Sequence, residues 1–189
     1  MFIQTEATPN PDVLKFLPGR EVLGEGTREF RDAEQALASP LAAELFALGD
    51  VTRVFFGPDF LTVMRSAGGR AWMQLKPPVL AAIMDHFTGA RPLLLDEVQE
   101  GHDEGAYEGD AAQIVAEIKD LLDTRIRPAV AQDGGDITFN RFEAATGVVF
   151  LNMRGACSGC PSSSATLRAG VENMLKHYVP EVTRVEQTL

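Results

Sequence analysis

The chain has 189 residues, of which 45% are hydrophobic and 23% charged, as in globular proteins that bury a packed core. Its net charge of −10 and pI of about 4.7 argue against binding to nucleic acid or to anionic membranes, because both need a basic surface. No apolar run approaches the roughly 18 residues of a membrane span. The N-terminal residues lack the pattern of a signal or transit peptide, so we expect a cytoplasmic protein or an already processed one.

Residues 1–95 are predicted to form a first domain that mixes helices and strands. Two short strands are expected on either side of the Pro-Asn-Pro turn at 9–11. Ser39 followed by Pro40 is typical of an N-cap and a first helical residue, and this helix should stop at Gly49.

A hairpin and a second helix are expected to complete this domain. Two β-rich runs, Val51–Phe56 and Phe60–Arg65, flank a Gly-Pro-Asp turn. A short helix is predicted to open at Pro78 and to close at Gly89. Trp72 precedes it and is interpreted as a core residue or a partner contact.

An acidic segment at residues 96–109 is interpreted as a flexible linker between two domains. The stretch from Leu95 to Asp110 has seven acidic residues, three glycines and no Lys or Arg. Such a segment buries little surface and repels itself. The alternative is a long solvated loop within one domain.

Residues 110–189 are predicted to form a second domain, an α-β-β-α unit, which makes the whole chain α+β. Asp110 is expected to cap a helix whose end Pro128 disturbs. The apolar stripe of that helix comprises Ile114, Ile118, Leu121, Leu122 and Ile126. The sequence "QDGGD" follows, and a turn explains Asp133 and Asp136 better than a metal site does.

Two strands and a final helix should follow this turn. The strands are expected at residues 137–142 and 147–153, and the helix at Pro161–Tyr178. An edge strand through Val182 and Val185 is a possible addition. The core-facing side of the final helix is predicted to carry Leu167, Val171, Met174, Leu175 and Tyr178.

The only cysteines of the chain, Cys157 and Cys160, form a C-x-x-C between the last predicted strand and the last helix. Gly155 and Gly159 allow tight backbone turns beside the sulfurs, and Pro161 suits the first turn of the helix. A helix N-terminus stabilises anions, so it should lower the cysteine pKa values. The thiolate is the form that binds metals.

Four interpretations of this pair remain open from the residues alone. Two copies of the chain can supply the four thiolates of an iron–sulfur cluster. A thiol–disulfide redox site is the second interpretation, although Pro161 follows the second cysteine, no aromatic residue precedes the first and no β-α-β unit is evident. A zinc site with ligands from another chain is the third, since His177 lies too far along the helix. The fourth is a pair with no chemical role.

No other residues indicate an active site. His86 and His102 stand alone, and isolated histidines are usually surface or helix-packing residues. No Ser-His-Asp arrangement, nucleophile elbow or phosphate-binding loop is recognisable. We therefore expect a protein that is not an enzyme.

Two parts of the sequence resemble known domains. The segments "IRPAVAQDGGDITFNRFE" and "GVVFLNMRGACSGCPSSSATLRAGVENMLKHYVPEV" resemble the NifU C-terminal domain, also called the Nfu domain. The first half, beginning "MFIQTEATPNPDVLKFLPG", resembles the N-terminal domain of bacterial and mitochondrial Nfu-type proteins. The resemblance covers nearly the whole chain apart from the acidic segment, and the C-x-x-C-P motif is specific.

This resemblance implies an iron–sulfur cluster scaffold or carrier. The cluster would be [4Fe–4S], or else [2Fe–2S], bound by Cys157 and Cys160 of two chains in a homodimer. The implied partners are the cluster-assembly machinery and apo iron–sulfur proteins, and the first domain would recognise such partners. A bacterial cytoplasmic protein or a processed protein of the mitochondrial matrix is expected.

Overall fold

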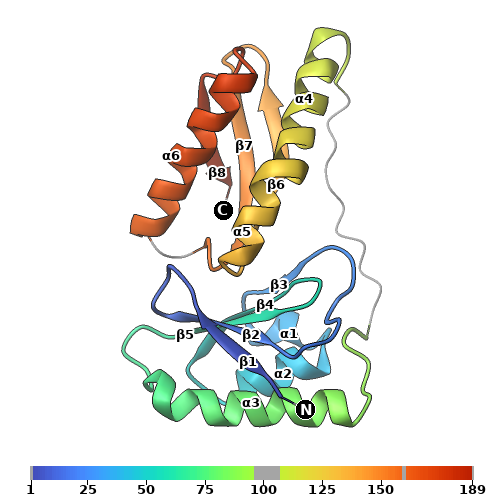
Figure 1. Ribbon diagram of the computed structural model, residues 1–189, viewed down its shortest axis with the longest axis vertical. Coiled ribbons are helices and arrows are strands. Elements are labelled where there is room, and N and C mark those ends of the chain that lie inside the picture. The colour runs from blue at the N-terminus through green and yellow to red at the C-terminus, as the bar shows by residue number, and fades with distance from the viewer. Residues whose placement is uncertain (1, 96–106, 159–160, 189) are drawn as a thin grey trace. The chain divides into compact units, whose positions relative to one another are not determined.

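The chain combines runs of strands with runs of helices in a computed structural model that describes residues 2–95, 107–158 and 161–188 (Figure 1). The chain divides into two compact units, Met1–Gln99 and Glu100–Leu189. Each unit has its own sheet and its own helices, which confirms the predicted α+β class. Residues 96–106 of the predicted linker lie outside the described residues. Within the described part of the chain, every helix is too short or too polar to cross a membrane.

The sheet of the first unit has five strands, all paired antiparallel, in the order β1-β2-β5-β4-β3. The strands are β1 (Gln4–Ala7), β2 (Val13–Leu17), β3 (Arg28–Phe30), β4 (Val51–Phe56) and β5 (Leu61–Arg65). The predicted strand pair around residues 9–11 is confirmed by β1 and β2, and the predicted hairpin by β4 and β5. The sequence did not predict β3, because three residues are too few to show an alternating pattern.

The helices of this unit are α1 (Ala33–Ala36), α2 (Pro40–Ala47) and α3 (Trp72–Thr88). The N-cap of α2 is confirmed, because the Ser39 hydroxyl accepts a hydrogen bond from the Ala42 N–H at 3.2 Å. Gly49 follows the end of α2 with a φ of 72°, a conformation in which glycine costs little.

The start of α3 differs from the prediction. The helix begins at Trp72 rather than at Pro78, which lies inside it. Tertiary contacts hold the added first turns: the indole Nε1 of Trp72 donates to the Pro11 carbonyl at 3.2 Å, and its ring packs edge-on against Phe16. Leu75 is fully buried. These contacts outweigh the local cost of proline in a helix.

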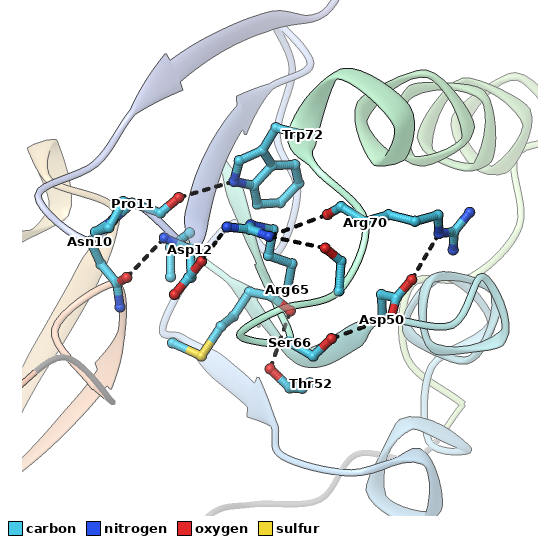
Figure 2. Close-up of polar contacts among 12 residues, drawn as sticks. Asn10, Pro11, Asp12, Asp50, Thr52, Arg65, Ser66, Arg70 and Trp72 are labelled. Carbon is cyan, nitrogen blue, oxygen red and sulfur yellow. Dashed lines mark hydrogen bonds and ion pairs between the residues drawn. The ribbon is translucent and has the colours of Figure 1, made fainter.

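Two arginines fix the segment between β5 and α3 (Figure 2). Arg65 forms an ion pair with Asp12 at 2.7 Å and donates to the carbonyls of Gly69 and Arg70 at 3.5 and 3.3 Å. Arg70 forms an ion pair with Asp50 at 2.8 Å. The two side chains thereby tie the turn before β2 and the turn before β4 to the entrance of α3.

The three helices of the first unit share one core with one face of its sheet (Figure 1). Large members of this core are Phe16, Phe30, Leu41, Leu45, Val54, Phe56, Leu61, Val63, Leu75, Val79 and Ile83.

His86, on α3, is also fully buried. Neither of its ring nitrogens has a hydrogen-bond partner among the described residues. Burial lowers the pKa of His86, the positive charge of Arg91 lowers it further, and the negative charge of Glu44 opposes the shift. His86 is therefore a packing residue of the helix, one of the two roles that the sequence predicted.

In the second unit, the first helical stretch is longer and less regular than predicted. Helix α4 (Asp110–Leu121) continues through a π-helical turn, Leu122–Ile126, into α5 (Arg127–Gln132). The predicted Asp110 cap is wrong: Gly109 is the N-cap and Asp110 is the first helical residue. Pro128 lies in the first turn of α5, directly after the π-helical turn, so the helix is disturbed near Pro128 as predicted, although the helical stretch continues to Gln132.

The remaining elements are β6 (Gly135–Glu143), β7 (Val148–Gly155), α6 (Pro161–Tyr178) and β8 (Arg184–Thr188). Strands β6 and β7 are antiparallel, whereas β8 runs parallel to β7 on its other side. Helix α6 has the predicted bounds. The predicted edge strand exists and contains Val185, but it begins after Val182. The unit is therefore α-β-β-α with an added parallel strand.

Helices α4, α5 and α6 enclose the core of this unit against its sheet (Figure 1). The core includes Val115, Ile118, Leu122, Ile126, Val130, Ile137, Val149, Leu151, Met153, Val171, Leu175, Val179 and Val185. Tyr178 was predicted to face this core but is 41% exposed. Its hydroxyl accepts a hydrogen bond from Arg125 at 3.1 Å, and the guanidinium lies over its ring.

Side chains bind one backbone amide on each outer strand of this sheet. The Tyr107 hydroxyl accepts a hydrogen bond from the Phe142 N–H of β6 at 2.7 Å. The Glu172 carboxylate accepts one from the Val185 N–H of β8 at 3.0 Å. Tyr107 also packs against Phe139, so the C-terminal end of the predicted linker is attached to the second unit.

Candidate functional site

The cysteine loop lies where β7 ends and α6 begins, inside a β-α-β unit formed by β7, α6 and β8. In such units ligands bind at the carboxyl ends of the strands, where helix N-termini direct their partial positive charge. The arrangement corrects one sequence argument, because the absence of a β-α-β unit had counted against a redox site. The position of Pro161, the first residue of α6, is as predicted.

Backbone hydrogen bonds shape the first part of the loop. Gly155 ends β7 with a φ of 63°, which confirms the expected turn at this glycine. Its carbonyl accepts hydrogen bonds from the Ser158 N–H at 3.1 Å and the Ser158 hydroxyl at 2.9 Å. The Ala156 N–H donates to the Gly134 carbonyl at 3.1 Å, which ties the loop to the segment before β6.

Cys157 lies in this loop with 5% of its surface exposed, and it belongs to the hydrophobic core of the second unit. Cys160 lies outside the described residues. The meeting of the two sulfurs in one site therefore stays a prediction. Thiolates are soft ligands, which favour iron–sulfur clusters, zinc or Cu(I) over magnesium and calcium.

The backbone of Gly135 lies directly against Cys157. A Cβ placed on Gly135 would be 2.4 Å from the Cys157 Sγ, 2.8 Å from the Arg154 carbonyl oxygen and 3.1 Å from the Cys157 nitrogen. Real Cβ atoms essentially never lie under 3.0 Å from another heavy atom. We call this space the Gly135 cradle: it is the volume beside Cys157 that any side chain at position 135 would enter.

An ion pair with a buried carboxylate follows the cradle on β6. Asp136 is 3% exposed, and its two carboxylate oxygens accept hydrogen bonds from Nε and Nη2 of Arg127 at 2.8 and 3.1 Å. It also accepts from the Ile137 N–H at 2.9 Å. These bonds, together with a 2.9 Å bond to Asp123, raise the pKa of Arg127, the bond to Asp136 contributing most. The pair fixes α5 to the start of β6, beside the cysteine loop.

The turn predicted for "QDGGD" is correct for its first part only. Asp133 caps the end of α5, and Gly134 turns the chain with a φ of 83°. Gly135 and Asp136 already belong to β6. The roles of Gly135, Asp136 and Arg127 were missed, because each depends on a residue that lies distant in the sequence. The only available signal was a second glycine, which the turn did not require.

Comparisons with known proteins agree with this architecture. Residues 3–90 match the family described as "Scaffold protein Nfu/NifU N terminal", and residues 118–186 match "NifU-like domain". The human protein named "NFU1 iron-sulfur cluster scaffold homolog, mitochondrial" is 49% identical over 189 residues, covering 100% of this chain and 72% of its own length. The chain belongs to the Nfu/NifU-like family.

Other members of the family are equally similar. "NifU-like protein 4, mitochondrial" of Arabidopsis thaliana is 51% identical over 99% of this chain and 66% of its own length. The Drosophila erecta NFU1 homolog is 53% identical over 99% of this chain and 65% of its own length. The chain thus spans about two thirds of the length of these relatives. A solution structure of a NifU-like protein from Saccharomyces cerevisiae is 24% identical with a TM-score of 0.46, covering 51% of this chain and 87% of its own.

Proposed function

We propose that this chain is an iron–sulfur cluster carrier that binds a [4Fe–4S] cluster through Cys157 and Cys160 of two copies. The cluster is its cargo, and the chain is not an enzyme. The observation that carries the proposal is the position of Cys157: it lies at a strand-to-helix junction in a chain that aligns over its full length with proteins named as cluster scaffolds.

The number of ligands supports a shared cluster. Each chain has two cysteines, whereas a [4Fe–4S] or [2Fe–2S] cluster bound by thiolates needs four. A two-fold pair of chains supplies this number with one copy of the same loop from each. Helix α6 begins directly after Cys160 in the sequence, so in this proposal its N-terminus supplies a partial positive charge that favours the thiolates.

Transfer requires ligand exchange and no covalent catalysis. A thiolate of an apo-protein binds a cluster iron as one cysteine thiolate of this chain leaves it, and repetition of this step moves the whole cluster. The departing thiolates stay on the carrier and take up protons from water. Thiolates with lowered pKa values are good leaving ligands in this exchange.

The two domains divide the work. In this proposal residues 1–95 recognise the assembly machinery or the apo-protein, residues 110–189 hold the cluster, and residues 96–109 link them. A linked module raises the effective concentration of the cluster near a bound recipient. Because the relatives have mitochondrial names, we propose the mitochondrial matrix as the site of action, or the cytoplasm in a bacterium.

Anaerobic reconstitution with iron and sulfide tests the proposal. We expect a visible chromophore, about four iron and four sulfide per two chains, and a change in solution mass from one chain to two. Cys157→Ser or Cys160→Ser should abolish the chromophore and the cluster-linked dimer. Ala169→Ser, at an exposed position on α6, is the matched control and should keep both.

Three results would contradict the proposal. A wild-type chain that stays colourless after loading would exclude cluster binding. Purified protein that carries zinc would favour the zinc interpretation. Catalytic turnover of a Cys157–Cys160 disulfide with small thiols would favour the redox interpretation.

A further inference from the structure

The buried position of Cys157 raises a question about loading. An iron shared with a second copy must lie outside the surface of this one, yet Cys157 is 5% exposed and packs in the core of its unit. Its Sγ occupies the Gly135 cradle, where an added Cβ would approach it to 2.4 Å. The cradle exists only because position 135 has no side chain.

We propose that Gly135 is a positioning residue that holds the Cys157 thiol inward in the cluster-free chain. The thiol has to leave the Gly135 cradle before it can bind iron. The cradle itself does not depend on the cluster; only the purpose assigned to it rests on the proposed function. Cys157 would thus be shielded while the carrier is empty and available once a cluster arrives.

The neighbouring contacts explain why the thiol, rather than the backbone, is the part that moves. The other two walls of the cradle, the Arg154 carbonyl and the Cys157 nitrogen, are backbone atoms. They are held by the β6–β7 pairing of Gly135 with Gly155 and by the Ala156–Gly134 hydrogen bond. The Sγ, in contrast, can change rotamer about a single bond.

The Asp136–Arg127 pair keeps the cradle in place. It anchors the residue directly after Gly135 to α5 through two hydrogen bonds. The start of β6 is therefore fixed by side chains as well as by strand pairing. A rigid wall beside the thiol confines it in the inward position, and a change of rotamer would move it out of the cradle.

Alkylation of the cluster-free full chain by iodoacetamide tests the proposal. In a Cys160→Ser background Cys157 is the only thiol, and its thiolate forms a C–S bond as iodide leaves. We expect native Cys157 to react at least about a hundredfold more slowly than the same chain in guanidinium, because the thiol must first open. Gly135→Ala should fill the cradle and raise the native rate by at least about tenfold. Its Cβ would also lie 2.8 Å from the Arg154 carbonyl oxygen, so the backbone has to shift and the folded fraction of the variant must be measured.

Two control variants separate the cradle from general destabilisation. Gly170→Ala adds a methyl group on α6 where nothing lies within 4 Å, and it should leave the alkylation rate unchanged. Val149→Ala weakens the core of the same unit at the far end of β7. It should raise the rate only in proportion to the unfolded fraction measured by circular dichroism.

The proposal fails if native Cys157 reacts at the rate of the unfolded chain, a result that needs no variant. It also fails if folded Gly135→Ala reacts as slowly as its parent, or no faster than its unfolded fraction explains. If the cluster cannot be reconstituted but Cys157 is still protected from alkylation, the proposed function is wrong. The proposed role of Gly135 in holding the thiol inward would still hold.

Discussion

The arginine–carboxylate pairs before α3 in the first unit and the pair beside the cysteine loop in the second unit differ in how deeply the carboxylate is buried. In the first unit Arg65 pairs with Asp12, and Arg70 with Asp50, through side chains that are between 21% and 40% exposed. In the second unit Asp136 receives two hydrogen bonds from Arg127, and its side chain is only 4% exposed. These two pairs of the first unit tie turns together, whereas Asp136 holds a buried charge beside the cysteine loop. The buried carboxylate of the first unit, Glu29, instead pairs with Arg31 and Arg53 at its sheet.

The difference matters because water sets the strength of an ion pair. An exposed pair contributes little, since its charges are well solvated when the pair breaks. A buried pair that loses one member leaves the other charge without solvent or partner. We therefore expect the second unit to depend more on Asp136 than the first unit depends on Asp12 or Asp50.

The largest effect is expected from Asp136→Asn. The change keeps the shape of the side chain but leaves Arg127 with Asp123 as its remaining charged partner at 2.9 Å. Because Arg127 is also 33% exposed, we expect the free energy of unfolding of the second unit to fall by about 2 kcal/mol, the contribution of the lost charge-assisted hydrogen bonds. Trp72, the only tryptophan, reports on the first unit alone, whereas far-UV circular dichroism follows both units.

The Trp72 fluorescence transition in guanidinium should thus stay in place while part of the circular dichroism transition moves to lower denaturant. Asp50→Asn is the matched change in the first unit, and it should shift the Trp72 transition only slightly, because the Asp50 side chain is 32% exposed and that of Asp136 only 4%. Equal losses of unfolding free energy in Asp136→Asn and Asp50→Asn would show that burial of the carboxylate does not determine how much each pair contributes.

A smaller effect is expected from Ser39→Ala in the first unit. Its hydroxyl is fully buried and accepts the Ala42 N–H at the start of α2. Removing the hydroxyl leaves that N–H without its acceptor, so we expect a loss of about 1–2 kcal/mol. The Trp72 transition measures it. Asp32→Ala removes the exposed N-cap of α1 and should cost less; a larger loss there would contradict the role of burial.

The smallest effect is a pH dependence of the first unit through His86. Burial lowers its pKa in the folded chain below the ordinary value of 6.5, so the unfolded chain binds the proton first. The stability that the uncharged, buried His86 contributes is therefore present above pH 6.5. It is lost as the pH drops from 6.5 toward the lowered pKa. We expect a loss of about 1 kcal/mol for each pH unit in that range.

His86→Leu should remove this slope, because leucine fills the buried position and does not titrate. Trp72 denaturation curves at pH 7.5 and pH 5.5 would be compared for the two proteins. Glu44 cannot account for the slope, since its pKa is lowered from 4.5, mainly by its hydrogen bond with Arg91. An unchanged slope in the variant would assign it to another group.

Local signals in the sequence predicted much of this fold. Ser39 before Pro40, the turn after Phe56 and the position of Pro161 each act within a few residues, and each is where it was expected. The start of α3 was missed because Trp72 is held by Pro11 and Phe16, which precede it by more than fifty residues. Local propensity alone could not weigh such contacts.

The candidate site also combines features that local sequence predicts with contacts that depend on other parts of the chain. The place of Cys157 between a strand and a helix could be predicted, because two cysteines with glycines and a proline are a local pattern. The contacts that fix the loop could not be predicted in this way. Gly135 and Cys157 meet only because β6 and β7 pair, and Asp136 meets Arg127 across the turn at Gly134. Residue type alone could not distinguish a glycine that turns the chain, such as Gly134, from a glycine that makes room for the Cys157 side chain, such as Gly135.

The hydrogen bonds from Phe142 to Tyr107 and from Val185 to Glu172 bear on how copies of this chain can associate. Each occupies an amide on an outer strand, where a strand from another molecule would otherwise dock. Both hydrogen bonds therefore disfavour pairing of a strand from another copy with the edge strands β6 and β8. If a shared cluster joins two copies, we expect the dimer to dissociate when the cluster is transferred. Delivery of the cluster would therefore also return the carrier to single chains.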